Sequence, residues 1–151
     1  MQVAEALKAS ALFKGFTDTG IQIIGGIAAS RAYPKGVPLF AESMLADALI
    51  IIAEGTVHLT SKSKAGEEVP LGDLGPGDHL GELSLIQQGQ RLCTATATSQ
   101  VVAIEIRHSD FQKLLAAKPQ ACLKLLMSIV THFGQKVLDN KDALKSLLGK
   151  P

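Results

Sequence analysis

The chain has 151 residues, of which 46% are hydrophobic, and a formal net charge of +1. This length is enough for one hydrophobic core of ordinary size and is short for two. The near-neutral charge argues against the basic surface of a double-stranded DNA binder and against an acidic tail. No apolar run reaches about 18 residues and Glu5 interrupts the first apolar stretch, so we expect neither a transmembrane helix nor a signal peptide.

The cysteine and histidine content gives no sign of a disulfide framework or a metal site. Cys93 and Cys122 are too few for a small secreted scaffold, so we expect reduced thiols in a cytoplasmic protein. No nucleophile elbow or P-loop is present, and we propose no enzymatic activity, metal or cofactor. His79 is interpreted as a solvent-facing turn residue. The histidines, which share no ligand spacing, are His58, His79, His108 and His132.

Two short helices are predicted at the N-terminal end. Apolar residues recur at helical spacing over residues 3–15. Thr17 or Asp18 is suited to cap a second helix over residues 18–29, where isoleucines keep the same period.

The character of the sequence then changes to that of a β-protein. From residue 37 to 108, short β-rich runs alternate with turns rich in Gly, Asp and Pro. Asp73 and Asp78 are interpreted as turn formers. Many short strands at regular turn spacing predict a small all-β barrel or roll. The predicted runs are residues 37–40, 48–53, 56–60, 68–71, 92–97 and 101–106.

A long amphipathic helix is predicted at the C-terminal end. The helical pattern starts near Ser109, and Pro119 suits the first position of a second helix that runs to about Leu148, with Gly134 as its weakest point. Two interpretations of its apolar stripe remain open. The stripe packs on the chain's own β-roll, or helix 119–148 forms a two-stranded coiled coil in a homodimer. The stripe, at heptad spacing, comprises Leu126, Val130, Phe133, Val137, Asn140, Leu144 and Leu147.

The segment 78–96 contains the groups that a cyclic phosphate and its ribose need. Gly81 allows a close turn into a helical turn whose first N–H groups can face an anion, and Gly89 closes that turn. Arg91 offers paired hydrogen bonds to a phosphate, and Glu82 can accept a hydrogen bond from a ribose hydroxyl. The alternative is a surface ion pair between Glu82 and Arg91 across a loop.

Motifs along the chain carry a family resemblance. Residues 74–85 read L-G-P-G-D-H-L-G-E-L-S-L, close to a family run L-x-P-G-D-x-x-G-E-L-A-L, and Arg91 follows Glu82 at the interval of kinase regulatory subunits. The chain thus resembles the cyclic nucleotide-binding domain family of the catabolite activator and protein kinase A regulatory subunits, over roughly residues 8–140. The other segments that carry the likeness are residues 11–16, 33–36 and 48–57.

The resemblance implies a mixed α+β fold in a single domain, residues 1–151. In that fold an eight-stranded antiparallel β-roll, jelly-roll-like, occupies residues 30–108. N-terminal helices within residues 3–29 and C-terminal helices within residues 109–148 flank the roll, and the last helix is long.

The resemblance also implies roles for individual residues. Glu82 is similar to the acceptor of the ribose 2′-hydroxyl, and Arg91 to the arginine that binds the phosphate. Asn140 resembles a position from which a dimer partner contacts adenine, although it is equally interpreted as a residue that only sets the register. The other positions placed at the ligand are Gly81, Leu83, Ser84, Leu92 and Cys93.

Leu92 departs from the family pattern, which has a small or hydroxyl residue after the arginine. A hydroxyl there is associated with guanine recognition, so the sequence favours cAMP over cGMP. The larger side chain is also expected to crowd the base or the phosphate, which puts binding in question.

Two functional hypotheses follow. In the first, the chain is a cyclic nucleotide sensor that signals through its C-terminal helix, as a homodimer and with a protein partner as a further candidate. In the second, it is a ligand-free member of the fold that serves as a dimerisation or docking module, and Leu92 is the feature that favours this. Neither hypothesis includes direct DNA binding or a membrane.

Overall fold

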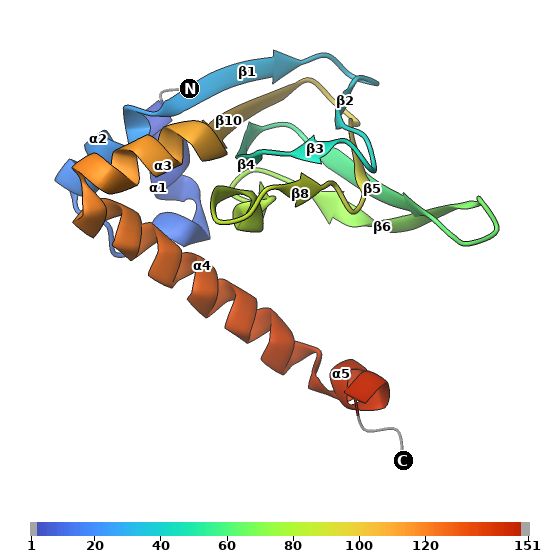
Figure 1. Ribbon diagram of the computed structural model, residues 1–151. Helices are drawn as coiled ribbons and strands as arrows, with labels where there is room; N and C mark the ends of the chain where they lie inside the picture. Colours follow the sequence, from blue (N-terminus) through green and yellow to red (C-terminus); the bar gives the residue numbers. More distant parts are fainter. Residues whose placement is uncertain (1–2, 149–151) are drawn as a thin grey trace.

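The computed structural model describes residues 3–148 and contains a β-roll with α1, α2 and α3 gathered at one end, from which α4 runs away toward α5 (Figure 1). This confirms the mixed α+β class that the sequence predicted. The helices are α1 (Val3–Ala9), the 3-10 helix η1 (Ala11–Phe13), α2 (Asp18–Gly25), the 3-10 helix η2 (Glu82–Leu85), α3 (His108–Ala117), α4 (Pro119–Asp139) and α5 (Lys141–Leu148).

The strands pair in an antiparallel manner throughout. Two four-stranded sheets have the orders β1-β10-β4-β7 and β2-β9-β5-β6, and β3 and β8 form a two-stranded ribbon. The hairpin β5–β6 projects from the end of the roll opposite the helices (Figure 1). The strands are β1 (Ala28–Tyr33), β2 (Pro38–Phe40), β3 (Leu45–Ala46), β4 (Ala48–Glu54), β5 (Val57–Lys62), β6 (Glu68–Leu74), β7 (His79–Leu80), β8 (Gly89–Gln90), β9 (Thr94–Ala97) and β10 (Val101–Arg107).

Strand β4 separates two hydrophobic cores. Successive side chains of a strand point to opposite faces, so Leu49 and Ile51 face the core formed with the helices, whereas Ile50 and Ile52 face the interior of the roll. Because both faces are covered, the strand is an uninterrupted apolar run rather than an alternating one. β10 divides its side chains between the two cores in the same way.

The described residues form ten strands rather than the eight predicted. Three of the ten, β3, β7 and β8, have only two residues each. The prediction was also wrong at residues 28 and 29. The helical period suggested a helix to residue 29, but α2 ends at Gly25 and β1 begins at Ala28. β1 pairs with β10 along its full length. A ladder to a distant strand is a tertiary interaction, which overrides a weak local helix propensity.

The predicted continuous helix over residues 119–148 is interrupted at Asn140. The backbone of Asn140 leaves the helical region (φ −111°, ψ 24°), and its Nδ2 donates to the carbonyl of Lys136 at 2.8 Å. The backbone N–H of Asn140 also donates to this carbonyl, at 3.1 Å, so the asparagine binds the last turn of α4 through both its backbone and its side chain. Gly134, predicted as the weak point, lies inside an unbroken α4.

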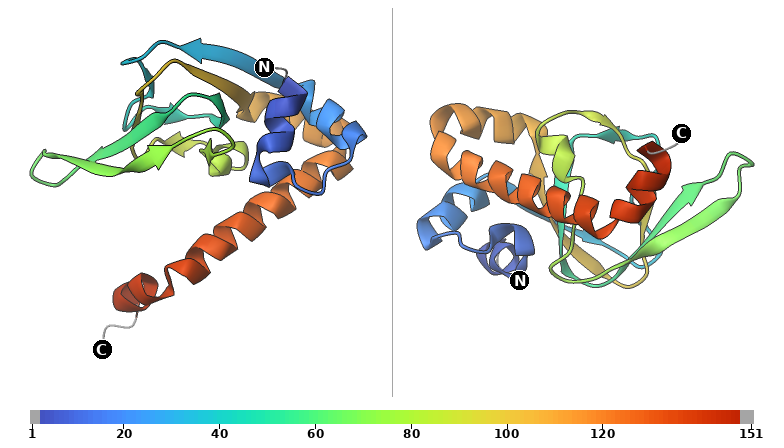
Figure 2. Two further views of the ribbon diagram at one scale, coloured as in Figure 1. Left: turned by 180° about the vertical axis from the view of Figure 1, so that it is seen from behind. Right: turned by 90° about the horizontal axis from the view of Figure 1, so that it is seen from below.

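The buried face of α4 is not the predicted seam. Cys122, Leu125 and Ile129 are buried against the helical core, whereas Val130 and Phe133 are 64% and 49% exposed. The C-terminal half of α4 runs beneath the roll without such burial (Figure 2). The interpretation that the whole stripe packs on the chain's own roll is therefore wrong. The seam positions Leu144 and Leu147 lie in α5, but their side chains are outside the described residues.

Leu85 ties η2 to the helical core, in which it is fully buried. We expect Leu85→Ala to lower the free energy of unfolding by about 3 kcal/mol, since it removes buried methyl groups and leaves a cavity. Leu83 is on the same short helix but 51% exposed, so Leu83→Ala is the matched control and should cost less than about 1 kcal/mol. Urea unfolding of both variants measures the difference, and equal losses would contradict this packing.

Candidate functional site

The candidate site lies where η2 and the loop after β8 approach the start of β4, and Gly81 sits at the point of closest approach. Gly81 has φ +72°, and a Cβ added there would lie 2.3 Å from Nη1 of Arg91 and 2.9 Å from the carbonyl oxygen of Ala48. Only glycine satisfies both the backbone conformation and the contact. η2 starts at the next residue and is capped at its C-terminal end by Ile86, so Gly89, predicted to close it, lies instead in β8.

Arg91 is a buried cation, with 7% of its surface exposed. Its Nη2 donates to the carbonyl of Ala48 at 3.0 Å, and its guanidinium carbon lies 4.2 Å from the centre of the Phe40 ring. Its Nε is buried with no hydrogen-bond partner. Burial lowers the pKa of Arg91 from its ordinary value, against the opposing effect of the Asp47 and Glu105 charges.

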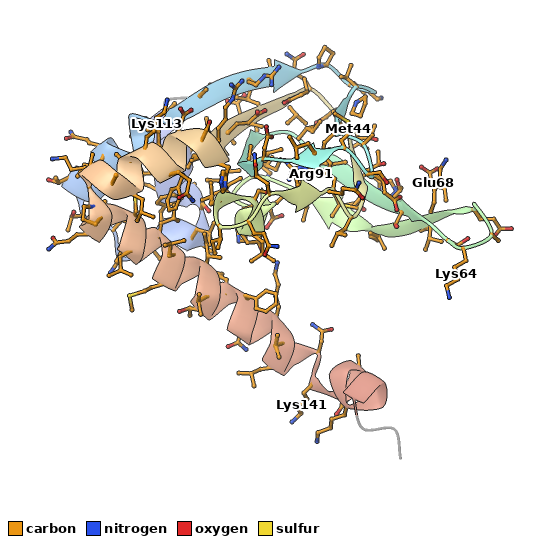
Figure 3. The ribbon with its side chains drawn as sticks, viewed as in Figure 1. Met44, Lys64, Glu68, Arg91, Lys113 and Lys141 are labelled. Atoms are coloured by element: carbon orange, nitrogen blue, oxygen red, sulfur yellow. The ribbon has the colours of Figure 1, made fainter. Side chains whose placement is uncertain are left out.

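Within residues 3–148, no carboxylate lies at ion-pair distance from Arg91. A buried charge without a counter-ion is costly, and proteins usually pair it. Figure 3 shows Arg91 among the strands of the roll, far from Lys64 at the tip of the β5–β6 hairpin. The guanidinium is therefore a fixed positive group, held away from bulk solvent.

Glu82 is nearly buried, with 13% of its side chain exposed. Its Oε2 accepts from Nδ1 of His79 at 3.3 Å, and its Oε1 from Nζ of Lys136 on α4 at 3.4 Å. Burial acts to raise the pKa of Glu82, but the hydrogen bonds from His79 and its own backbone N–H and the nearby charges lower it to about 2. Glu82 is thus an ionised acceptor, and the alternative of a surface ion pair with Arg91 is wrong.

His79 does not face solvent as the sequence suggested. Its side chain is 9% exposed, and besides Glu82 it makes an edge-on contact with His132 of α4, with 5.9 Å between ring centres. Asp73 was also misinterpreted, because it lies in β6 and pairs with His58. Asp78 does form a turn, and its Oδ2 accepts from the N–H of Gly75 at 2.8 Å.

These residues surround an open cavity of about 430 Å³. Phe133 and Lys136 of α4 also line it, and neither was predicted as a site residue from the sequence. Phe133 belongs to the predicted stripe, which was a usable signal, but nothing in the sequence brings Lys136 to a glutamate 54 positions away. Asn140 caps α4 and is not among the lining residues. The predicted residues that line the cavity are Gly81, Glu82, Leu83, Ser84, Arg91, Leu92 and Cys93.

Leu92 does not fill the cavity. Its side chain is 87% exposed at the rim, so it leaves the space beside Arg91 open. Cys93 is half-buried, and burial raises the pKa of its thiol, partly offset by the charge of Arg91. Cys93 and Cys122 are both free thiols.

Residues 3–148 contain neither a metal-binding cluster nor a membrane-spanning helix. No group of three histidine, cysteine or acidic side chains in this range is arranged to hold a metal ion. No helix in the same range is long and apolar enough to cross a membrane.

The fold and the cavity define a class of β-rolls in which a buried arginine lines an open cavity, and comparison with known proteins identifies the family. The family model described as "Cyclic nucleotide-binding domain" matches residues 30–118. The chain belongs to this family, which confirms the resemblance in the sequence.

Curated relatives and solved structures agree with this assignment. The chain is 32% identical over 113 residues to the cyclic AMP receptor protein of Thermus thermophilus, covering 75% of this chain and 52% of that protein. It is 30% identical over 122 residues to a CRP-like cAMP-activated global transcriptional regulator of Mycobacterium tuberculosis, covering 81% and 54%. The chain spans about half the length of these relatives.

Among solved structures, the N-terminal domain of a transcriptional regulator from Streptomyces coelicolor is 29% identical, with a TM-score of 0.78 over 87% of this chain and 94% of that one. The catabolite activator protein of Thermus thermophilus is 27% identical, with a TM-score of 0.80 over 91% and 63%.

The lowered pKa of Glu82 predicts an acid-dependent loss of stability. An unfolded glutamate titrates near 4.5 and Glu82 near 2, so its contribution is complete above pH 4.5 and disappears as the pH falls toward 2. Between about pH 5 and 2, the free energy of unfolding should fall by roughly 2–3 kcal/mol more in the wild type than in Glu82→Gln. Glu67→Gln, at an exposed position between β5 and β6, is the control and should lose stability with pH as the wild type does. Chemical unfolding at each pH measures this, and parallel curves for Glu82→Gln and the wild type would contradict the assigned contacts.

Proposed function

We propose that this chain is the cyclic nucleotide-binding part of a sensor, and that its ligand is a cyclic nucleoside monophosphate. The observation that carries the proposal is the buried guanidinium of Arg91, which lines the cavity with its Nε unpartnered and, within residues 3–148, with no carboxylate at ion-pair distance. A cyclic phosphate diester carries one negative charge and two free oxygens, which suits the paired donors of an arginine. Binding would neutralise a cation that the fold has already desolvated.

The remainder of the cavity supports a nucleotide rather than a bare anion. Its volume of about 430 Å³ falls in the range of sites for small organic ligands. Glu82 is ionised and retains lone pairs beyond those used by His79 and Lys136, so it can accept from a ribose hydroxyl. Phe133 lines the cavity and is 49% exposed, so a base could pack against its ring.

We propose cAMP rather than cGMP as the ligand. The first support is the absence of a hydroxyl at Leu92, since a hydroxyl after the arginine is the feature the family associates with guanine. The second is that the relatives from Thermus thermophilus and Mycobacterium tuberculosis are described as a cyclic AMP receptor and as cAMP-activated. The first observation concerns a residue of this chain and the second concerns its relatives, and both favour cAMP.

We propose that binding is signalled through α4. Lys136 contacts Glu82, and Phe133 lines the cavity, so α4 supplies part of the wall that a ligand would touch. A ligand whose ribose engages Glu82 changes the contacts of Lys136 and so biases the position of α4. A ligand shifts such an equilibrium only through differential contacts with the two positions, and these two residues provide them.

The ligand-free docking module receives no comparable support. The argument for it was that Leu92 obstructs the site, but the side chain is 87% exposed. The apolar surface of α4 fits the sensor equally well, with a second copy of the chain as the partner through that helix. The proposal includes no DNA contact by these residues, in keeping with their near-neutral charge.

A direct test of the ligand is calorimetry with cAMP and cGMP on the wild type and on Arg91→Ala. We expect wild-type binding, tighter for cAMP, and at least about a hundredfold loss in Arg91→Ala, because a buried phosphate charge is left without its partner. Arg107→Ala, which removes an exposed arginine at the end of β10, is the matched control and should bind normally. Unchanged affinity in folded Arg91→Ala would overturn the assignment.

A second test addresses the proposed dimer. The exposed apolar residues of α4 are too numerous to be isolated surface positions. Val130→Glu should therefore shift the chain toward monomer in sedimentation equilibrium, since a charge in an apolar helix interface is poorly tolerated. Gln135→Glu adds the same charge at a polar, exposed position and should leave the association unchanged. Equal effects of both variants would argue against an interface on this face. The residues of the face are Leu123, Met127, Val130, Phe133, Val137 and Leu138.

A further inference from the structure

Two side chains of α3 hold the carbonyl groups at the end of η2. Nδ1 of His108 lies 2.8 Å from the carbonyl oxygen of Ser84, and Nε2 of Gln112 donates to the carbonyl oxygen of Leu85 at 3.1 Å. η2 has four residues, so its last carbonyls cannot be satisfied by further turns of the same helix. α3 therefore supplies the partners that the short helix cannot supply for itself.

The His108 contact has a defined donor. A carbonyl oxygen only accepts hydrogen bonds, so Nδ1 of His108 must carry the proton that it shares with Ser84. The contact is partly buried, where an unmade hydrogen bond costs more than it does in water. The ring thus holds the Ser84 carbonyl by a directed hydrogen bond and not by packing alone.

The same histidine is connected to the phosphate side of the site. The backbone N–H of His108 donates to the carbonyl of Asp47 at 2.7 Å, and the carbonyl of the next residue, Ala48, accepts from Arg91 at 3.0 Å. Gly81 approaches this same Ala48 carbonyl. His108 therefore holds η2 through its side chain and, through its backbone, the segment that holds Arg91.

We infer that His108, assisted by Gln112, is a positioning residue for the cyclic nucleotide site. This inference rests on the proposed function. The histidine sets the distance between the η2 backbone and Arg91 before a ligand binds.

The test compares His108→Ala, His108→Asn and the control His58→Ala, with two readouts. Asparagine places an amide N–H close to the position of Nδ1, whereas His58 pairs with Asp73 on the β5–β6 hairpin. The first readout is cAMP affinity by calorimetry. The second is amide hydrogen exchange at Ile86 and Gln87 in the ligand-free protein, whose N–H groups bond to the Leu83 carbonyl.

We expect His108→Ala to weaken cAMP binding about tenfold and to speed exchange at these two amides by a similar factor. His108→Asn should recover most of both losses, and His58→Ala should change neither. Wild-type values in His108→Ala overturn the inference, as does a failure of His108→Asn to recover either loss when thermal unfolding shows that all variants are folded.

The two readouts separate this inference from the proposed function. If the wild type binds neither cAMP nor cGMP, the proposed function fails. The exchange rates at Ile86 and Gln87 then still decide whether His108 positions η2.

Discussion

The burial of the Arg91 charge is the constraint around which the site is organised. A guanidinium removed from water needs partners, and the fold supplies one backbone carbonyl, from Ala48, and one aromatic face, from Phe40. Its Nε is buried without a hydrogen-bond partner. The close approach of the guanidinium also determines the residue at position 81, where any side chain would collide with it. The enclosed and incompletely satisfied charge is the feature on which the proposed anion site rests.

The architecture around this charge joins the site to the helices. β4 carries Ala48 at its start and then divides its side chains between the roll interior and the helical core. η2 lies against the same strand, with Leu85 in the helical core and Glu82 toward α4. Two sets of contacts join the cavity to the C-terminal helices. One is the pair of hydrogen bonds from His108 and Gln112 of α3 to the carbonyls of η2, and the other is the ion pair between Glu82 and Lys136 of α4.

Much of the fold was predictable because its signals are local. The apolar run of β4 and the turn residues of segment 78–96 are each patterns contained in a few neighbouring residues. The convergence of Glu82 and Arg91 on one cavity followed from family resemblance rather than from residue types alone. What could not be predicted depends on distant partners. β1 exists because β10 pairs with it, and His79 is enclosed because Glu82 and His132 approach it. The break at Asn140 is a different case, since an asparagine in a heptad seam fits both a register-setting residue and a helix cap.

The central claim is that the unpartnered guanidinium of Arg91 is the phosphate site of a cyclic nucleotide. A crystal structure of the chain grown with saturating cAMP tests this most directly. The account predicts density for the nucleotide in the cavity, with the cyclic phosphate within hydrogen-bond distance of Arg91 and the ribose hydroxyl at Glu82. A well-ordered structure with cAMP bound elsewhere, or with an empty cavity and Arg91 unchanged, would contradict it.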